Sequence, residues 1–215
     1  MKVAIIGTGN VGQALGSSLL RSGHEVTFAA RDADKTRQVA QQLGAASADQ
    51  PAQAAAQAEV TILAVPYNAL AEVAEEIRGS VEGKVVIDPT NPGPASSGGP
   101  SAAERLAERL PGGHVAKALN TLFGSFMAQP DLQQRKVDAL FATDSDDARA
   151  KVAELLGSLG FRPLDVGGLE AARQMEAMAW LNIQLQMRYS GDWNSTFVLV
   201  GAPAAAVRET ASSRN

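Results

Sequence analysis

The chain opens on a short apolar run that ends in glycine. Residues 3–6 are all apolar, which is typical of a strand buried on both faces. A glycine-rich turn follows, and apolar residues then recur at helical spacing over residues 11–21. The pattern therefore predicts a strand, a tight turn and an amphipathic helix in the first part of the chain.

Short apolar runs and helical patterns alternate along the rest of the sequence. Further strands are expected at residues 25–29, 45–48, 60–65, 84–88, 115–119, 138–142 and 162–166. Further helices are expected at residues 34–43, 51–58, 68–77, 101–110, 146–159 and 169–189. This alternation predicts an α/β fold with a Rossmann-type, doubly wound, mostly parallel sheet and a small C-terminal helical part. We expect a Rossmann domain over residues 1–125, and a C-terminal part over residues 126–215 that completes the sheet edge and carries the long helix.

Some helix ends and faces can also be predicted. Asn68 and Ser101 are residue types that favour the N-cap of a helix, so each is expected to begin one. The long helix of residues 169–189 is apolar on more than one face, which predicts burial on two sides, against the sheet and against a partner subunit or ligand. Its methionines, Met175, Met178 and Met187, are interpreted as core residues rather than as a cofactor site.

The turn after the first strand has the spacing G-x-G-x-x-G, in the strand–turn–helix context that dinucleotide binding requires. The first glycine permits the tight turn, the second lets the backbone approach a pyrophosphate, and the third allows close packing of helix and strand. The helix N-terminus offers unpaired N–H groups to the phosphates. The alternative is a plain strand-to-helix turn without a ligand. The predicted contact residues are Gly7, Thr8, Gly9, Asn10, Val11 and Gly12.

The end of the second strand predicts which dinucleotide binds. An acidic residue there would bond the ribose 2′-hydroxyl of NAD, whereas an arginine accommodates the 2′-phosphate of NADP. This chain has Ala30 at that position, followed by Arg31 and, in the next helix, by Lys35 and Arg37. The pattern favours NADP. Two alternatives stay open: Asp32 could bond the ribose hydroxyl, or Asp32 or Asp34 could cap the helix while the basic residues face solvent.

Other predicted strands end at the same edge of the sheet. Because the ligand crevice lies outside the carboxyl ends of the strands, Ala64, Val65 and Pro66 are expected to border the ribose or nicotinamide. The loop of residues 89–100, which contains Asn91, is rich in Pro, Gly and Ser and leaves the same edge. We expect it to pass near the nicotinamide. The alternative is a surface insertion without a role in binding.

Composition narrows the function classes. The formal net charge of the 215 residues is −4 and no basic patch is evident, which argues against nucleic-acid binding. The chain has no cysteine and two histidines far apart in sequence, so it predicts no disulfide, thiolate or metal site, and His24 is interpreted as structural. There is no signal-like segment and no apolar run of the ~20 residues needed to span a bilayer, so a cytoplasmic protein is expected.

Five segments together resemble a known family: GTGNVG, AARDADK, LAVPYNAL, VAKALNTLFG and SLGFRPLDVGGLEAARQMEAMA. They are similar to the NADPH-dependent reductases of the deazaflavin coenzyme F420, and also resemble the N-terminal oxidoreductase domain of the six-transmembrane metalloreductases. The similarity runs from Met1 to about Leu185. It implies a Rossmann domain with a small helical C-terminal part, and hydride transfer between NADP(H) and a deazaflavin or flavin.

The resemblance also implies roles for particular residues. Thr8, Arg31 and Lys35 would contact the 2′-phosphate, and Ala30 stands where relatives often have a serine. The strand ends at Val65-Pro66 and at residues 118–121, which include Ala118 and Asn120, would flank the nicotinamide. The tail of residues 186–201 departs from the family pattern and would help to shape the second redox partner's pocket.

No motif places a proton-donating side chain beside a substrate. Lys117 is the candidate at the crevice edge, and its alternative interpretation is a strand lysine that faces solvent or a carboxylate. Hydride transfer to a flavin-type ring needs mainly positioning. We therefore expect an NADP(H)-dependent enzyme that reduces coenzyme F420 or a flavin. The alternatives are a reductase of a small imine or keto compound, assisted by Lys117 or Asn120, and a non-catalytic NADP-binding sensor. The long helix favours a homodimer.

Overall fold

The computed structural model describes residues 1–93, 99–132, 135–189 and 191–201. These residues form an eight-stranded sheet in the order β10-β9-β6-β5-β4-β1-β2-β3. The strands are β1 (Lys2–Ile6), β2 (Glu25–Ala29), β3 (Ala46–Ser47), β4 (Val60–Leu63), β5 (Val85–Asp88), β6 (His114–Ala118), β9 (Asp138–Thr143) and β10 (Arg162–Asp165). All neighbouring strands pair in parallel except β6 and β9, which pair antiparallel. The predicted doubly wound, mostly parallel sheet is confirmed, with the second part of the chain extending its edge.

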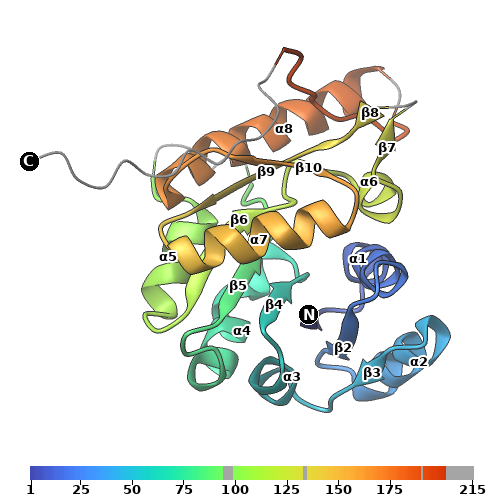
Figure 1. Ribbon diagram of the computed structural model, residues 1–215, viewed down its shortest axis with the longest axis vertical. Coiled ribbons are helices and arrows are strands. Elements are labelled where there is room, and N and C mark those ends of the chain that lie inside the picture. Colours follow the sequence, from blue (N-terminus) through green and yellow to red (C-terminus); the bar gives the residue numbers. More distant parts are fainter. Residues whose placement is uncertain (94–98, 133–134, 190, 202–215) are drawn as a thin grey trace, which may run out of the picture.

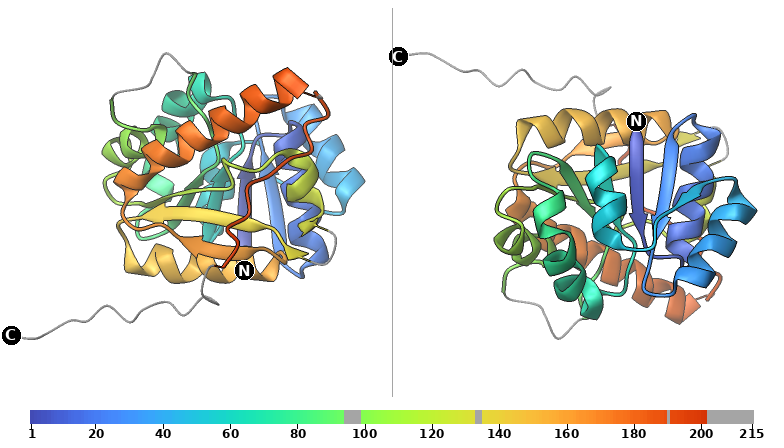
Figure 2. Two further views of the ribbon diagram at one scale, coloured as in Figure 1. Left: turned by 90° about the horizontal axis from the view of Figure 1, so that it is seen from above. Right: turned by 90° about the horizontal axis from the view of Figure 1, so that it is seen from below.

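Helices cover both faces of the sheet (Figure 1, Figure 2). The helices are α1 (Asn10–Arg21), α2 (Ala33–Leu43), α3 (Pro51–Gln57), α4 (Leu70–Ile77), α5 (Ala102–Arg109), α6 (Gly124–Ala128), α7 (Asp146–Ser158) and α8 (Ala172–Tyr189). One core lies under α1, α2 and α7, and includes Leu15, Val39 and Leu155. The other lies under α3, α4 and α5, and includes Ala54 and Leu106. Alternate residues of the central strands enter opposite cores, which explains why these strands are mostly apolar.

The predicted helix ends are partly right. Ser101 caps α5 in a capping box with Glu104, as expected. Asn68 does not cap α4, so that prediction is wrong. A 3₁₀ turn over Tyr67–Ala69 precedes α4, and no side chain caps the helix. Pro66 begins this turn, because its carbonyl accepts a hydrogen bond of 2.9 Å from the amide of Ala69.

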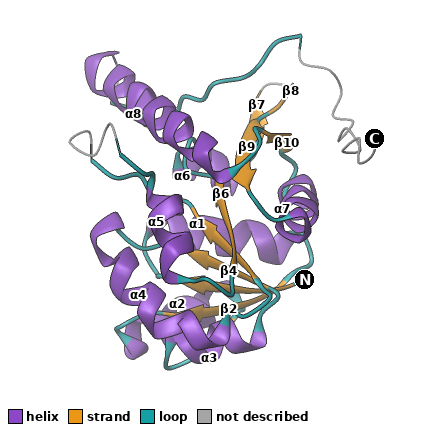
Figure 3. Cartoon of the chain, turned by 90° about the vertical axis from the view of Figure 1, so that its left-hand side faces the viewer, coloured by secondary structure: helices purple, strands orange, loops and turns teal. Residues whose placement is uncertain are grey.

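The long helix α8 packs against the start of α5 and against β9 (Figure 1, Figure 3). Its buried positions form one stripe that is partly polar, consisting of Ala172, Met175, Glu176, Ala179, Asn182 and Gln186. Leu181 and Met187 are left exposed by the described residues, and the prediction of Met187 as a core residue is wrong. No helix among the described residues is long and apolar enough to cross a membrane.

The chain after α8 folds back over the molecule as a strap of residues 191–201. Ser195 hydrogen-bonds to the side chains of Asn182 and Gln186 on α8. Trp193, at a φ of 51°, packs edge-to-face on Phe123 with ring centroids 5.4 Å apart. The strap therefore ties α8 to the turn that follows β6.

A short antiparallel ribbon pairs β7 (Asp131–Leu132) with β8 (Arg135–Lys136).

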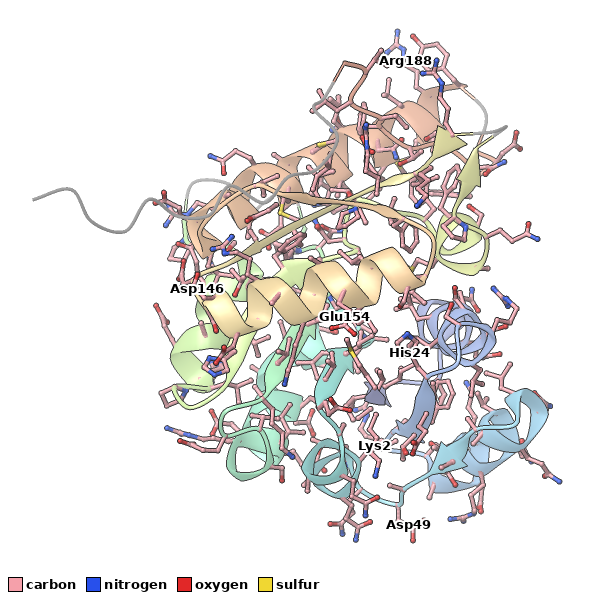
Figure 4. All side chains as sticks on the ribbon, viewed as in Figure 1. Lys2, His24, Asp49, Asp146, Glu154 and Arg188 are labelled. Atoms are coloured by element: carbon pink, nitrogen blue, oxygen red, sulfur yellow. The ribbon has the colours of Figure 1, made fainter. Side chains whose placement is uncertain are left out.

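His24 links the start of the chain to α7, since its ring contacts the N-terminal amine at 3.3 Å and the Ser158 hydroxyl at 2.8 Å (Figure 4). Burial lowers its pKa. These contacts agree with the structural interpretation of His24.

Candidate functional site

The glycine turn between β1 and α1 is fixed by close packing at two of its glycines. Gly7 has a φ of 121°, and a Cβ there would lie 2.1 Å from the carbonyl oxygen of Ala64. A Cβ at Gly12 would lie 2.2 Å from the carbonyl oxygen of Gly7. Both positions therefore exclude every side chain on steric grounds, and they hold the start of α1 tightly against β1 and β4.

Gly9 differs from its two neighbours in the motif. It is exposed, and a Cβ built on it would meet nothing within 4 Å. Gly9 is also the N-cap of α1, and no side chain caps that helix. The first-turn N–H groups of α1 therefore face an open space, which is the arrangement that binds phosphate at a helix N-terminus.

Two cations follow β2, whose last residue, Ala29, accepts a 2.8 Å hydrogen bond from the amide of Gly7 in the glycine turn. Arg31 and Lys35 are exposed, and neither side chain forms an ion pair with any residue that the structure describes. Asp32 caps α2 by accepting a 3.0 Å hydrogen bond from the amide of Lys35. Asp32 is therefore the N-cap of α2.

The next basic residue is already engaged. The guanidinium of Arg37 contacts Asp34 at 2.6 Å and Asp49 at 2.8 Å, and these carboxylates raise its pKa. Arg37 therefore offers a matched contrast to Arg31 on the same side of the molecule.

Residues 64–66 follow β4, the neighbour of β1 in the sheet. Ala64 and Val65 are half-buried and Pro66 is exposed. Because a Cβ on Gly7 would overlap the carbonyl of Ala64, these residues lie directly beside the glycine turn. The structure therefore brings two predicted contact segments, residues 7–12 and residues 64–66, together at one edge of the sheet.

The ends of β5 and β6 are joined by two asparagines. The side-chain amide of Asn91 donates to the carbonyl of Asn120 at 2.8 Å, and that of Asn120 donates to Oδ1 of Asn91 at 2.9 Å. Between Ala118 and Asn120 the chain turns at Leu119, which has a φ of 67°. The Asn91–Asn120 pair thus fixes the geometry of the edge at which Asn91, Ala118 and Asn120 were predicted to meet the nicotinamide.

Lys117 does not face the crevice. Its side chain is fully buried, and its Nζ lies 3.0 Å from Oδ2 of Asp88 and 2.8 Å from Oε1 of Glu176. The interpretation in which this lysine faces a carboxylate is the one that the structure supports. Burial raises the pKa of Glu176, and Lys117 opposes that rise.

Asp88 and Glu176 were missed as partners of Lys117. Asp88 is the last residue of a predicted strand, and a charged residue at a buried strand end was the available signal. Glu176 carries a weaker signal, because its place on the inner stripe of α8 is visible only once the face of that helix is known.

A groove of about 540 Å³ lies elsewhere, beside the start of α8. Its lining comes from β9, the turn after β10 and α8, and consists of Leu140, Val166, Glu170, Ala171, Arg173, Gln174, Met175 and Met178. This groove is separate from the glycine turn.

Known proteins resemble this chain over most of its length. The family model described as "NADP oxidoreductase coenzyme F420-dependent" matches residues 2–92. The F420-dependent NADP reductase of Methanothermobacter marburgensis is 36% identical over 211 residues, covering 87% of this chain and 93% of that protein. Metalloreductase STEAP3 of Rattus norvegicus is 31% identical over 183 residues, covering 82% of this chain and 36% of that protein.

A solved structure shows that the similarity extends to the fold. A protein of Arthrobacter sp. FB24, provisionally described as an F420-dependent NADP reductase, superposes with a TM-score of 0.85 at 27% identity. The superposition covers 93% of this chain and 99% of that one. Similarity along nearly the full length of both chains, on a fold whose glycine turn is intact, shows that this chain belongs to the family of the F420-dependent NADP reductases.

Proposed function

We propose that this protein is an oxidoreductase that transfers hydride between NADP(H) and coenzyme F420. The observation that carries the nucleotide half is the open space at Gly9, in a turn that is otherwise closed by packing at Gly7 and Gly12. A pyrophosphate would bind there, beside the uncapped N-terminus of α1. The F420 half rests on membership of the family, whose relatives are described as F420-dependent NADP reductases.

We assign the adenosine half of the nucleotide to the β2 side of the glycine turn. Arg31 and Lys35 would hold the 2′-phosphate, because both are exposed and outside the ion pairs of the described residues. Guanidinium groups bind phosphate with two parallel hydrogen bonds, and an ammonium adds a point charge. Thr8, also assigned to the 2′-phosphate by the family resemblance, lies in the glycine turn and is 6% exposed, and Ala30 contributes no side-chain hydrogen bond.

The nicotinamide half then extends toward β4, β5 and β6, on the other side of β1 in the sheet. Ala64, Val65 and Pro66 would border its ribose, while Ala118 and the Asn91–Asn120 pair would lie at the ring. This direction follows from the sheet order, because a dinucleotide bound at β1 spans the carboxyl ends of the strands on both sides of it.

The nicotinamide of NADPH, when bound, supplies the hydride. The chain's own task is to bind both flat rings, hold them in contact and exclude water. Lys117 donates no proton to a substrate in this arrangement, because its ammonium is buried between carboxylates. The alternative of imine or keto reduction assisted by Lys117 or Asn120 thereby loses Lys117 as a proton donor, and we favour the deazaflavin as the acceptor.

The experiment that tests this proposal mixes the protein with NADPH and either F420 or FMN, without oxygen. Bleaching of the F420 absorbance, much faster than that of FMN, is the expected result. Equal rates would make the acceptor a flavin in general. NADPH binding without oxidation by either acceptor would favour the alternative of a non-catalytic NADP-binding sensor.

We also infer a homodimer formed through the outer face of α8. Leu181 and Leu185, one turn apart on that face, are exposed in the single chain. A helix with apolar side chains on its outer face is commonly covered by a partner. Light scattering on the purified protein should give the mass of two chains, and the mass of one chain at all concentrations would contradict this inference.

A further inference from the structure

A buried charged cluster joins the last residue of β5, the next-to-last residue of β6 and helix α8. Lys117 and Asp88 are both 0% exposed, and Glu176 is 7% exposed. Nζ of Lys117 contacts both carboxylates, at 3.0 Å and 2.8 Å. The cluster therefore removes one cation and two carboxyl groups from water at once.

Such a cluster is not explained by stability alone. Burying charged groups costs solvation free energy, and well-packed apolar residues of similar volume are often at least as stabilising. Buried polar networks do, however, fix a single arrangement of the groups they contact. The hydrogen bonds that these three side chains make to residues outside the cluster therefore indicate its role.

Those contacts converge on the backbone of Thr90, the residue before Asn91. Oδ1 of Asp88 accepts a 2.8 Å hydrogen bond from the amide of Thr90. Nζ of Lys117 donates to the carbonyl of the same residue. Both backbone polar groups of Thr90 are thus held by the cluster, which fixes the chain immediately before the Asn91–Asn120 pair.

Glu176 joins this arrangement to two helices. Besides Lys117, its Oε1 accepts a 2.9 Å hydrogen bond from the amide of Ala102, the first residue of α5. A continuous path of hydrogen bonds therefore leads from α8 through Glu176, Lys117 and Thr90 to the edge of the sheet. Each link along this path is buried.

We propose that Glu176, Lys117 and Asp88 are positioning residues for hydride transfer. Through the backbone of Thr90 they set the Asn91–Asn120 pair at the nicotinamide end of the crevice. The inference rests on the proposed function for the identity of the reaction. It does not depend on the identity of the acceptor, because the positioned group is the nicotinamide half of NADP(H).

The structure supplies a matched control on the same two helices. Arg173, one turn before Glu176 on α8, pairs with Glu104 of α5 at 2.6 Å, and its side chain is 51% exposed. This pair also ties α8 to the start of α5, but in the part of the chain that the structure describes neither residue hydrogen-bonds to Thr90 or Lys117. Arg173→Gln therefore tests helix anchoring alone.

The experiment compares Glu176→Gln with Arg173→Gln in the full chain. Glutamine keeps the size of the side chain and an oxygen for the amide of Ala102, but it removes the charge that faces Lys117. We expect kcat with F420 to fall ~10- to 100-fold, because small misplacements of reacting groups are this costly. The KM for F420 should change much less. The control should keep the wild-type kcat.

Two nucleotide affinities give a readout that does not require turnover. NADPH and 2′,5′-ADP share the 2′-phosphate, but only NADPH has a nicotinamide. Glu176→Gln should weaken NADPH by about tenfold, or about 1.4 kcal/mol, and leave 2′,5′-ADP unchanged. Should this variant not fold, Asp88→Asn, which acts directly on Thr90, takes its place in both measurements.

Wild-type kcat and an unchanged ratio of the two affinities in the folded variant would overturn the inference. An equal loss in Arg173→Gln would also overturn it, because the effect would then come from helix anchoring. If the wild-type protein reduces no F420, the proposed function fails. The ratio of NADPH to 2′,5′-ADP affinity would still decide whether the cluster positions the nicotinamide half.

Discussion

The two sides of the crevice use charged residues in opposite ways. On the β2 side, Arg31 and Lys35 are exposed and outside the ion pairs that the described residues form. On the β5–β6 side, Lys117 is fully buried and contacts two carboxylates. A hydrated cation costs the fold little and is available to a ligand, whereas a buried cation needs partners within the protein.

This difference separates binding from positioning. The β2 side offers charge and open space, which suit recognition of phosphate groups. The β5–β6 side offers a rigid backbone, which suits alignment of a ring for hydride transfer. Substitutions on the β2 side should therefore alter nucleotide affinity. Substitutions on the β5–β6 side should alter turnover more than the affinity for phosphate groups.

The largest effect is expected from Gly9→Val. Its side chain would occupy the open space beside the N-terminus of α1. We expect NADPH affinity to fall more than ~100-fold, because the pyrophosphate would lose both space and hydrogen bonds, about 3 kcal/mol in total. Titration calorimetry measures this change. Gly79→Val is the control, because a Cβ there also meets nothing within 4 Å; retained affinity in Gly9→Val would reduce the motif to a simple turn.

The next effect is expected from Arg31→Ala. Loss of a charged hydrogen bond to the 2′-phosphate should weaken NADPH by about 1.5–3 kcal/mol and NADH far less. Arg37→Ala should change neither affinity appreciably, since Arg37 is paired with Asp34 and Asp49. Equal losses of NADPH and NADH in Arg31→Ala would contradict the assignment of NADP.

The smallest effect concerns acid stability at the α5–α8 contact. The hydrogen bond from Arg173 is the main cause that lowers the pKa of Glu104 from 4.5 to about 2. A lowered carboxyl pKa contributes stability above the unfolded pKa, and this contribution is lost as the pH falls from 4.5 through 2. Because Arg173 is half exposed, we expect only ~0.5 kcal/mol.

Denaturant unfolding between pH 2 and 6 measures this contribution. The wild-type protein should lose more stability than Arg173→Gln over that range. Identical pH profiles for the two proteins would mean that the exposed pair adds nothing measurable.

The sequence predicts the fold well because its signals are local. The strand, turn and helix of residues 2–21 lie almost where the apolar pattern and the glycines place them. Ser101 caps its helix because both partners of its capping box lie within four residues. Asn68 fails as a cap because Pro66 starts a 3₁₀ turn that includes it.

The buried site could not be predicted in the same way. Lys117 contacts Glu176 across 59 positions of sequence, a pairing that only the packing of α8 creates. The two interpretations of Lys117 could not be separated without that contact. The stripe of α8 that is buried is also partly polar, so apolar periodicity alone could not identify it.

The most direct test of the proposed NADPH-dependent reduction of F420 is a single-turnover measurement of F420 absorbance with enzyme and either NADPH or NADH. F420 should be reduced at least about tenfold more efficiently with NADPH than with NADH, since Arg31 and Lys35 bind the 2′-phosphate that NADH lacks. Equal reduction with both nucleotides would contradict the role of the β2 side. No reduction with either nucleotide would contradict the proposed reaction itself.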